Sequence, residues 1–168
     1  QCASCFRYFP KRMATSIAQA AEYCTVCADP NRDASLLMIV ERDVDLDAVE
    51  KSGAYQGRYF VLGGRIPILE QHPEERVRLR ELERAVLERA TAKNTDTKLL
   101  EIVFALSVTP EGENTEHILM ARLKPNIEKY AIRHTTLGRG LSTGLELEYS
   151  DIETLRNALE GRRELPGL

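Results

Sequence analysis

Four cysteines lie within the first 27 residues of the chain and form two Cys-x-x-Cys pairs. Each pair can present two thiolates from one tight turn, and four thiolates suit the tetrahedral coordination of Zn²⁺. Because four thiolates leave no coordination position open, the ion would be structural and not catalytic. The predicted zinc ligands are Cys2, Cys5, Cys24 and Cys27.

A pair of disulfides and a redox dithiol are the alternative interpretations of these cysteines. The start of the chain is unlike a secretory signal, which argues against disulfides. Two Cys-x-x-Cys pairs in one short segment argue against a redox dithiol. Zinc is therefore the favoured interpretation.

Acidic residues follow two apolar runs, 36–40 and 99–106, that are typical of buried strands. In open parallel sheets, ligand chemistry gathers at the carboxyl ends of the strands. A Mg²⁺ site for phosphoryl transfer needs several carboxylates that converge from two such loops. The candidate magnesium ligands are Glu41, Asp45, Glu111 and Glu113.

The same acids also have a structural interpretation, because acidic residues near helix N-termini stabilise the helix macrodipole. Ser107 and Thr109 stand where a metal site would want aspartates. We therefore favour the structural interpretation, and we expect Mg²⁺ to associate only weakly. The three histidines have no metal-ligand spacing.

The elements that would position these residues alternate between strands and helices, which predicts an α/β fold with a parallel sheet. Pro125 is expected to end one helix, and Ser150 with Glu153 is expected to form a capping box for another. The predicted strands are 36–40, 58–64, 99–106, 130–137 and 145–149. The predicted helices are 14–23, 43–53, 74–92, 114–125 and 150–161, and the 74–92 helix has an apolar stripe of Val77, Leu82, Val86, Leu87 and Ala90.

Composition limits the classes of partner. The chain has 168 residues, enough for one compact domain with a small appendage. It contains no apolar run of 18 residues, so no membrane span is expected. The net charge is -3, so nucleic-acid binding would have to come from a local patch of cations. The weak candidates for DNA contacts are Arg7, Lys11, Arg12, Lys51 and Arg58.

The segment between the cysteine pairs interleaves cations with Phe6, Tyr8 and Phe9. Such a pattern can stack bases and hold phosphates. Packing of these aromatic rings against the small zinc module is the favoured alternative.

Several motifs of the chain, taken in order, resemble the RecR family of recombination-repair proteins. They are the cysteine pairs, "IVERDVDLDAVEKSGAYQGRYFVLGG", "PEGENTE" and "GLSTGLELEYSDIETLRNALEGRR". The resemblance implies a four-cysteine zinc-finger module at 1–34, a Toprim domain at 35–136, and a C-terminal Walker-B-like segment with a helix at 137–168. It also leads us to expect the family's helix-hairpin-helix domain upstream of Gln1.

Under this resemblance, the four cysteines match the family's zinc ligands, and the four candidate magnesium ligands match its Toprim acids. The C-terminal acidic element is matched by Glu146, Glu148, Tyr149 and Asp151. Three departures stand out: a longer loop between the cysteine pairs, Ser107 and Thr109 in place of aspartates, and 144–146 in place of Gly-Gly-Asp. The last two make catalysis or nucleotide hydrolysis less expected.

The resemblance implies a non-catalytic DNA recombination and repair protein in the bacterial cytoplasm, at the nucleoid. Family members form homo-oligomers, dimers or tetrameric rings, that clamp DNA. They work with RecO and RecF in loading recombinase at gapped DNA, and the Toprim acids are a candidate docking surface for such a basic partner. The alternative is a Mg²⁺-dependent Toprim enzyme of nuclease, primase or topoisomerase type. A nucleotide-binding module is the weakest interpretation, because no phosphate-binding Gly-rich loop accompanies the Walker-B-like segment.

Overall fold

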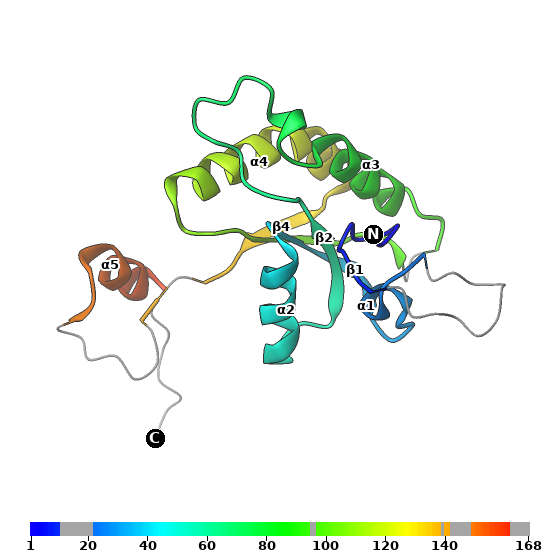
Figure 1. Cartoon of the computed structure of the whole chain (residues 1–168), viewed down its shortest axis with the longest axis horizontal. Helices are drawn as coiled ribbons and strands as arrows, with labels where there is room; N and C mark the ends of the chain where they lie inside the picture. The colour runs from blue at the N-terminus through cyan, green and yellow to red at the C-terminus, as the bar shows by residue number, and fades with distance from the viewer. Residues whose placement is uncertain (11–21, 95–96, 139, 142–148, 162–168) are drawn as a thin grey trace. The chain divides into compact units, whose positions relative to one another are not determined.

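A computed structural model describes residues 1–10, 22–94, 97–138, 140–141 and 149–161 (Figure 1). The chain forms two compact units, 1–136 and 137–168. The cysteine segment belongs to the first unit. The expected boundary between residues 34 and 35 stays a prediction. Among the helices of the described ranges, none is both long and apolar enough to cross a bilayer.

A parallel sheet of four strands organises the first unit. The strands are β1 (Asp33–Val40), β2 (Gly57–Val61), β3 (Glu101–Ala105) and β4 (Arg133–Thr136), in the spatial order β2-β1-β3-β4. All three pairings are parallel, which confirms the predicted α/β fold. Val40 pairs with Val61 on one side and with Ala105 on the other. The residues that follow these three strands therefore leave the sheet at the same edge.

Both faces of the sheet are covered, which explains why β1 reads as a continuous apolar run. Figure 1 shows α3 (Leu79–Ala90) and α4 (Pro110–Tyr130) on one side of the sheet. It shows α2 (Asp43–Ser52) and α1 (Thr25–Ala28) on the other side.

Alternate residues of β1 point into two separate cores. Leu37 and Ile39 belong to the larger core with α3 and α4. Met38 and Val40 belong to a smaller core that also holds Leu46 of α2 and three of the cysteines. Burial of each such side chain contributes about 1.5–3 kcal/mol to folding. The cysteine segment is thus part of the covering of one face of the sheet.

The structure corrects the expected start of the 74–92 helix. Residues Pro73–Glu75 form a single 3-10 turn, η1, and α3 begins only at Leu79. Leu79 is buried in the core, whereas Leu87, expected in the apolar stripe, is 42% exposed. Val77, also expected in the apolar stripe, is buried in the core, but it lies in the link between η1 and α3 and not in the helix.

Pro125 does not end its helix, contrary to expectation. It lies inside α4, which runs on to Tyr130 and ends at Ala131 in a left-handed conformation, φ 52°. Leu123 and Ile127 on either side of the proline are both buried in the core. Their packing outweighs the hydrogen bond that proline removes from the helix. The following strand, β4, begins at Arg133 and not at residue 130. Gly53 ends α2 with φ 66°, as predicted.

The second unit contains α5 (Ile152–Glu160), which confirms the C-terminal helix. The predicted capping box of Ser150 and Glu153 is wrong: the N-cap is Asp151, whose carboxylate accepts from the backbone N–H of Thr154 at 2.9 Å. A carboxylate serves this role as well as a hydroxyl, and it adds a negative charge at the helix N-terminus. Most of the predicted helix 14–23 and most of the predicted strand 145–149 lie outside the described residues.

Candidate functional site

The structure brings the four cysteines together at one point. Their sulfur atoms all lie within 4.8 Å of one another, and three of the four residues are buried. All four are free thiols. The sulfur atoms of Cys5 and Cys24 are 3.7 Å apart. That is close to the edge of a tetrahedron of sulfurs placed about 2.3 Å from a central ion, which is about 3.8 Å. The cluster can therefore hold a metal ion.

Each cysteine pair forms a tight turn. In the first turn, the backbone N–H of Phe6 donates to the carbonyl of Cys2 at 3.1 Å. The backbone φ of Phe6 is 63°, a value that residues other than glycine seldom adopt. Its ring packs against Phe60 with ring centres 5.2 Å apart, which compensates for the strain. The second turn lies against the first, because the N–H of Cys24 donates to the sulfur of Cys2 at 3.4 Å.

The thiols of the cluster share hydrogen bonds, so they titrate together. Hydrogen bonds with Cys24, Cys27 and Cys5 lower the pKa of Cys2. Hydrogen bonds with Cys2, Cys24 and Cys27 raise the pKa of Cys5. Four adjacent negative charges repel one another strongly, and a bound divalent cation removes that repulsion. The donor set and its burial both suit a soft, tetrahedral ion.

The cysteine segment is joined to the sheet by hydrogen bonds from several elements. The N–H of Val61 in β2 donates to the carbonyl of Cys5 at 2.9 Å. Arg58, also in β2, donates to the carbonyls of Val26 and Cys27 at 3.2 and 2.9 Å. Arg89 of α3 donates to the hydroxyl of Ser4 at 3.2 Å. These contacts fix the orientation of both cysteine turns against the sheet.

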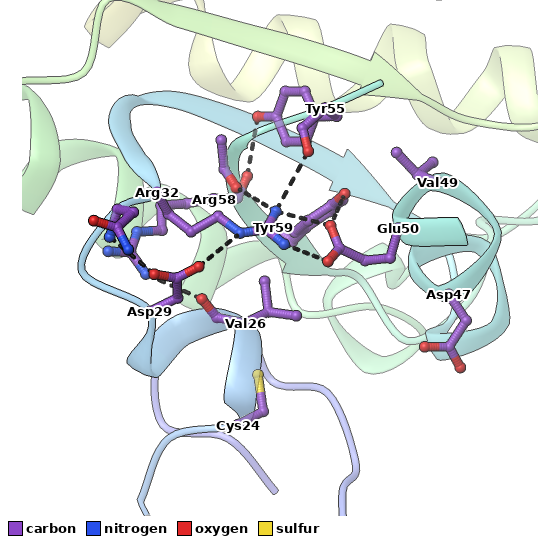
Figure 2. Close-up of polar contacts among 12 residues, drawn as sticks. Cys24, Val26, Asp29, Arg32, Asp47, Val49, Glu50, Tyr55, Arg58 and Tyr59 are labelled. Atoms are coloured by element: carbon purple, nitrogen blue, oxygen red, sulfur yellow. Dashed lines mark hydrogen bonds and ion pairs between the residues drawn. The ribbon is translucent and has the colours of Figure 1, made fainter. Parts of the chain in front are cut away.

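A polar network lies beside the second cysteine turn, and Figure 2 shows it. The guanidinium of Arg32 binds both carboxylate oxygens of Glu50 on α2, with one of the two distances 2.8 Å. The hydroxyl of Tyr59 donates to the same carboxylate at 2.6 Å. Burial acts to raise the pKa of Glu50, but the hydrogen bonds from Arg32 and Tyr59 outweigh it, so the pKa is lowered. The network holds the segment before β1 against α2 and β2.

Glu41 directly follows β1, as expected, and it is almost completely buried, with 3% of its surface exposed. One carboxylate oxygen accepts from the backbone N–H of Ser107 at 2.8 Å and from the Ser107 hydroxyl at 2.6 Å. The other oxygen faces the guanidinium of Arg65, with an N–O distance of 3.3 Å. Both oxygens of this carboxylate are therefore used within the protein.

The loop after β3 is shaped by small residues. Thr109 is the N-cap of α4, and its hydroxyl accepts from the N–H of Gly112 at 3.2 Å. The Thr109 hydroxyl also lies 3.2 Å from the Ser107 hydroxyl and 3.2 Å from the guanidinium of Arg65. A Cβ atom at position 112 would lie 1.9 Å from the carbonyl oxygen of Ser107, so only glycine fits. The hydroxyls at 107 and 109 thus take part in the hydrogen bonding around Glu41.

The other three predicted acids have separate positions. Asp45 reaches back to accept from the backbone N–H of Arg42 at 2.9 Å, as part of the cap of α2. Glu111 and Glu113 lie exposed in the first turn of α4. Within the described ranges, only the cysteines gather three or more potential ligands closely enough to hold a metal ion. Magnesium binding by the acids stays a prediction.

The predicted DNA contacts fall into three groups. Arg7 is paired with Asp47 at 2.5 Å, and Arg58 makes the carbonyl contacts given above. Lys51 is exposed at the end of α2. Lys11 and Arg12 lie outside the described residues, as do Glu146 and Glu148 of the C-terminal element. Asp151 of that element is the cap of α5. DNA binding by these cations stays a prediction.

Reasoning from the sequence did not place any arginine at these sites, and Arg58 was predicted only as a DNA contact. Arg65 follows a glycine pair at the carboxyl end of β2, the same edge as Glu41, so its position could have indicated the ion pair. Arg32, Arg58 and Arg89 carry no such signal, because their partners lie far away in the sequence.

Comparison with known proteins agrees with this architecture. The Toprim domain family matches residues 35–133, and the C-terminal RecR family matches residues 140–163. A recombination protein RecR of Chloroflexus aurantiacus is 39% identical over 144 residues, which cover 86% of this chain and 65% of that protein. The corresponding RecR of Sphingopyxis alaskensis is 43% identical over 141 residues, with 83% and 65% covered.

A third relative, recombination protein RecR of Lactobacillus acidophilus, is 38% identical over 144 residues. The match covers 86% of this chain and 67% of that relative. The chain thus spans about two thirds of the length of the curated relatives that it matches. With the Toprim sheet, the cysteine cluster and the matching C-terminal region, this similarity shows that the chain belongs to the family of RecR recombination proteins.

Proposed function

We propose that this protein is a non-catalytic scaffold of DNA recombination and repair. It acts as a homo-oligomeric ring, dimeric or tetrameric, that clamps DNA at single-strand gaps. There it works with RecO and RecF in loading recombinase, at the nucleoid of the bacterial cytoplasm. The names of the relatives support a role in recombination. The ring, the DNA structure and the two partners rest on the family resemblance.

The observation that carries the non-catalytic part of the proposal is the state of Glu41. A carboxylate that is to bind a catalytic Mg²⁺ or move a proton must face the ion or the substrate, and Glu41 is 3% exposed. Both oxygens of Glu41 have partners, namely Ser107 and Arg65. The aspartates that would share a metal with it are replaced by hydroxyls, and these hydroxyls contribute to the hydrogen bonding around Glu41.

The cysteine cluster is proposed to hold a structural Zn²⁺. Four sulfur ligands, a separation of 3.7 Å between two of them, and burial within a hydrophobic core all fit such an ion. When bound, zinc would crosslink the two cysteine turns and so support the covering of one face of the sheet. Magnesium would associate at most weakly with the acidic residues.

The Toprim acids are proposed to take part in docking a basic protein partner such as RecO. Glu111 and Glu113 are exposed in the first turn of α4, so a partner can reach them, whereas Glu41 is buried beneath the loop. We expect the double substitution Glu111→Gln and Glu113→Gln to weaken RecO binding in a calorimetric titration. Replacing Glu128→Gln, near the far end of the same helix, is the matched control. Equal RecO affinity of the double variant and the control would refute this docking surface.

The central experiment tests for chemistry on DNA. The protein is incubated with gapped duplex and with supercoiled plasmid, in Mg²⁺ or Mn²⁺, and the products are separated on native and denaturing gels. Intact strands in a retarded complex are the expected result. Metal-dependent cleavage, relaxation or primer synthesis that disappears in a Glu41→Gln variant would overturn the non-catalytic proposal. Sedimentation analysis tests the ring, and a purely monomeric protein would refute it.

A further inference from the structure

Two arginines of the Toprim domain donate hydrogen bonds to the segment that carries the two cysteine turns, here called the cysteine module, one arginine to each turn. Arg58 comes from β2 and donates to the carbonyl oxygen of Cys27, at 2.9 Å. Arg89 comes from α3 and donates to the hydroxyl of Ser4, which lies between Cys2 and Cys5 in the first turn. Their side chains are therefore held beside opposite halves of the same cluster.

These two arginines differ from the arginines that belong to the cysteine segment itself, and from Arg78, which lies over the ring of Phe6 at 5.8 Å and donates to the carbonyl of Val61. Arg7 and Arg32 both form ion pairs with acids, Asp47 and Glu50. In the part of the chain that the structure describes, neither Arg58 nor Arg89 has a carboxylate within 4.0 Å. Both residues are half-buried. An arginine that is partly removed from water without an anion is disfavoured, so negative charge nearby would stabilise it.

The cysteine cluster supplies negative charge once a metal is bound. Four thiolates around one divalent cation carry a net charge of -2 (-4 from the ligands and +2 from the ion). The cluster is embedded in a hydrophobic core, where an uncompensated dianion is unfavourable. Arg58 and Arg89, which contact the two cysteine turns, carry the opposite charge that such a dianion requires.

The influences on Arg89 act in opposite directions. The pKa of its guanidinium is lowered, because burial is the largest influence, whereas the charges of Cys27 and Cys5 act to raise it. Negative charge on these two sulfurs thus favours the cation that burial disfavours. Arg58 acts against Arg89 through repulsion of like charges, which places the two cations within electrostatic reach of each other.

We propose that Arg58 and Arg89 are the counter-cations of the tetrathiolate metal centre, and that they link metal binding to the docking of the cysteine module on the Toprim sheet. The proposal rests on the cysteines holding Zn²⁺, as proposed above. Arg58 and Arg89 are positioning residues: they contact the turns that carry the ligands and not the ion. Metal release weakens the attraction of both arginines for the module, and their loss weakens metal binding.

The test measures zinc affinity of the whole chain by competition with a chromophoric chelator. Partners of metal ligands typically change metal affinity by 10–100-fold. We expect Arg89→Gln and Arg58→Gln each to weaken zinc binding at least tenfold. Arg84→Gln is the matched control, because Arg84 lies on the same helix and lines the same hollow, of about 240 Å³, as Arg89. We expect it to leave the affinity unchanged.

A second variant separates charge from shape. Arg89→Lys keeps the cation but loses the planar fork, so we expect its zinc affinity to stay within about threefold of the unsubstituted protein. A loss as large as that of Arg89→Gln would overturn the proposal. If the glutamine variant does not fold, the zinc affinity of Arg89→Lys still tests the role of the positive charge.

Co²⁺ substitution provides a readout that a merely structural role would not produce. A tetrathiolate cobalt site has a characteristic thiolate charge-transfer absorption, which shows whether all four ligands remain bound. We expect the Arg89→Gln site to keep this spectrum at saturation and to require more cobalt to reach it. Unchanged zinc affinity in both glutamine variants would refute the counter-cation role. A lack of any zinc or cobalt binding by the unsubstituted chain would instead refute the zinc site itself.

Discussion

Replacing Ser107 by aspartate tests why this Toprim loop carries hydroxyls. The Ser107 hydroxyl lies 2.6 Å from a Glu41 oxygen, and Glu41 is 3% exposed. Ser107→Asp therefore puts a second carboxylate next to a buried one. Two unit charges 4 Å apart repel with about 4 kcal/mol at an effective dielectric constant of 20. The variant also loses a hydrogen bond to a charged group, which is worth about 1.5–3 kcal/mol.

Ser107→Asn is the matched control, because asparagine has nearly the shape of aspartate without its charge. Both variants lose the serine hydroxyl, so the difference between them isolates the repulsion. We expect Ser107→Asp to be less stable than Ser107→Asn by up to about 4 kcal/mol in a divalent-free buffer, reduced by the nearby Arg65. Urea denaturation, followed by circular dichroism, measures both free energies of unfolding.

The same stability measurements are repeated with Mg²⁺ present. Two carboxylates that repel each other form a site for a hard divalent cation, so Mg²⁺ should recover stability in the aspartate variant and not in the asparagine variant. Equal stability of the two variants without Mg²⁺ would refute the inference that Ser107 is needed to accommodate a buried, charged Glu41. A stabilising effect of Mg²⁺ on both variants would show that the ion acts elsewhere.

Three further predictions concern the loop, the polar network and the cysteine cluster. Gly112→Ala should destabilise the protein by about 1–3 kcal/mol in urea denaturation, because the new methyl group collides with the carbonyl of Ser107, whereas Gly138→Ala, with open space around it, should change little. The lowered pKa of Glu50 adds stability that is present above the pKa of an unfolded glutamate, about 4.3, and is lost as the pH falls through the folded value. The free energy of unfolding should therefore decrease more between pH 7 and acid in the unsubstituted protein than in Glu50→Gln. Equal decreases in the two proteins would contradict the role given to the ion pair of Glu50 with Arg32. Removal of the proposed metal by a strong chelator should lower the midpoint of thermal unfolding, measured by calorimetry, by several degrees. An unchanged midpoint would show that metal binding at the cysteine cluster does not stabilise the fold.

The sheet was predictable from the sequence because its strands are buried on both faces. The run 36–40 is apolar without interruption, which is typical of a parallel strand between two layers of helices. The spacing of the cysteines likewise predicted that they would meet, since each pair needs only a local turn. In both cases the signal lies in a few neighbouring residues, namely an uninterrupted apolar run or a pair of closely spaced ligands.

Predictions failed where distant contacts outweigh local preference. Pro125 would end an isolated helix, but the buried residues on both sides of it hold α4 together. At α5 the failure is local: the Ser150 and Glu153 pattern predicted the wrong cap, because Asp151, one residue later, accepts from the backbone N–H of Thr154. The pairing of Arg89 with a turn 85 residues away has no local signature at all.

Of the candidate acidic site, the position of Glu41 was predictable from the sequence, but the partners of its carboxylate were not. Glu41 had to emerge beside the loop after β3, because neighbouring parallel strands end at one edge. The pairing of its carboxylate oxygens with Ser107 and Arg65 depends on side-chain geometry that only the folded structure supplies.

The contact between Cys5 and β2 has a consequence for association between molecules. β2 is an outermost strand of the sheet, and an outermost strand presents unpaired backbone groups to which another chain can add. The backbone N–H of Val61 donates to the carbonyl of Cys5. The carbonyl of Val61 accepts from the guanidinium of Arg78 at 2.8 Å. The cysteine module thus shields this edge of the sheet. We expect loss of the proposed metal to loosen this contact and expose the edge of β2 to pairing with a neighbouring copy, so metal binding would also protect the protein against aggregation.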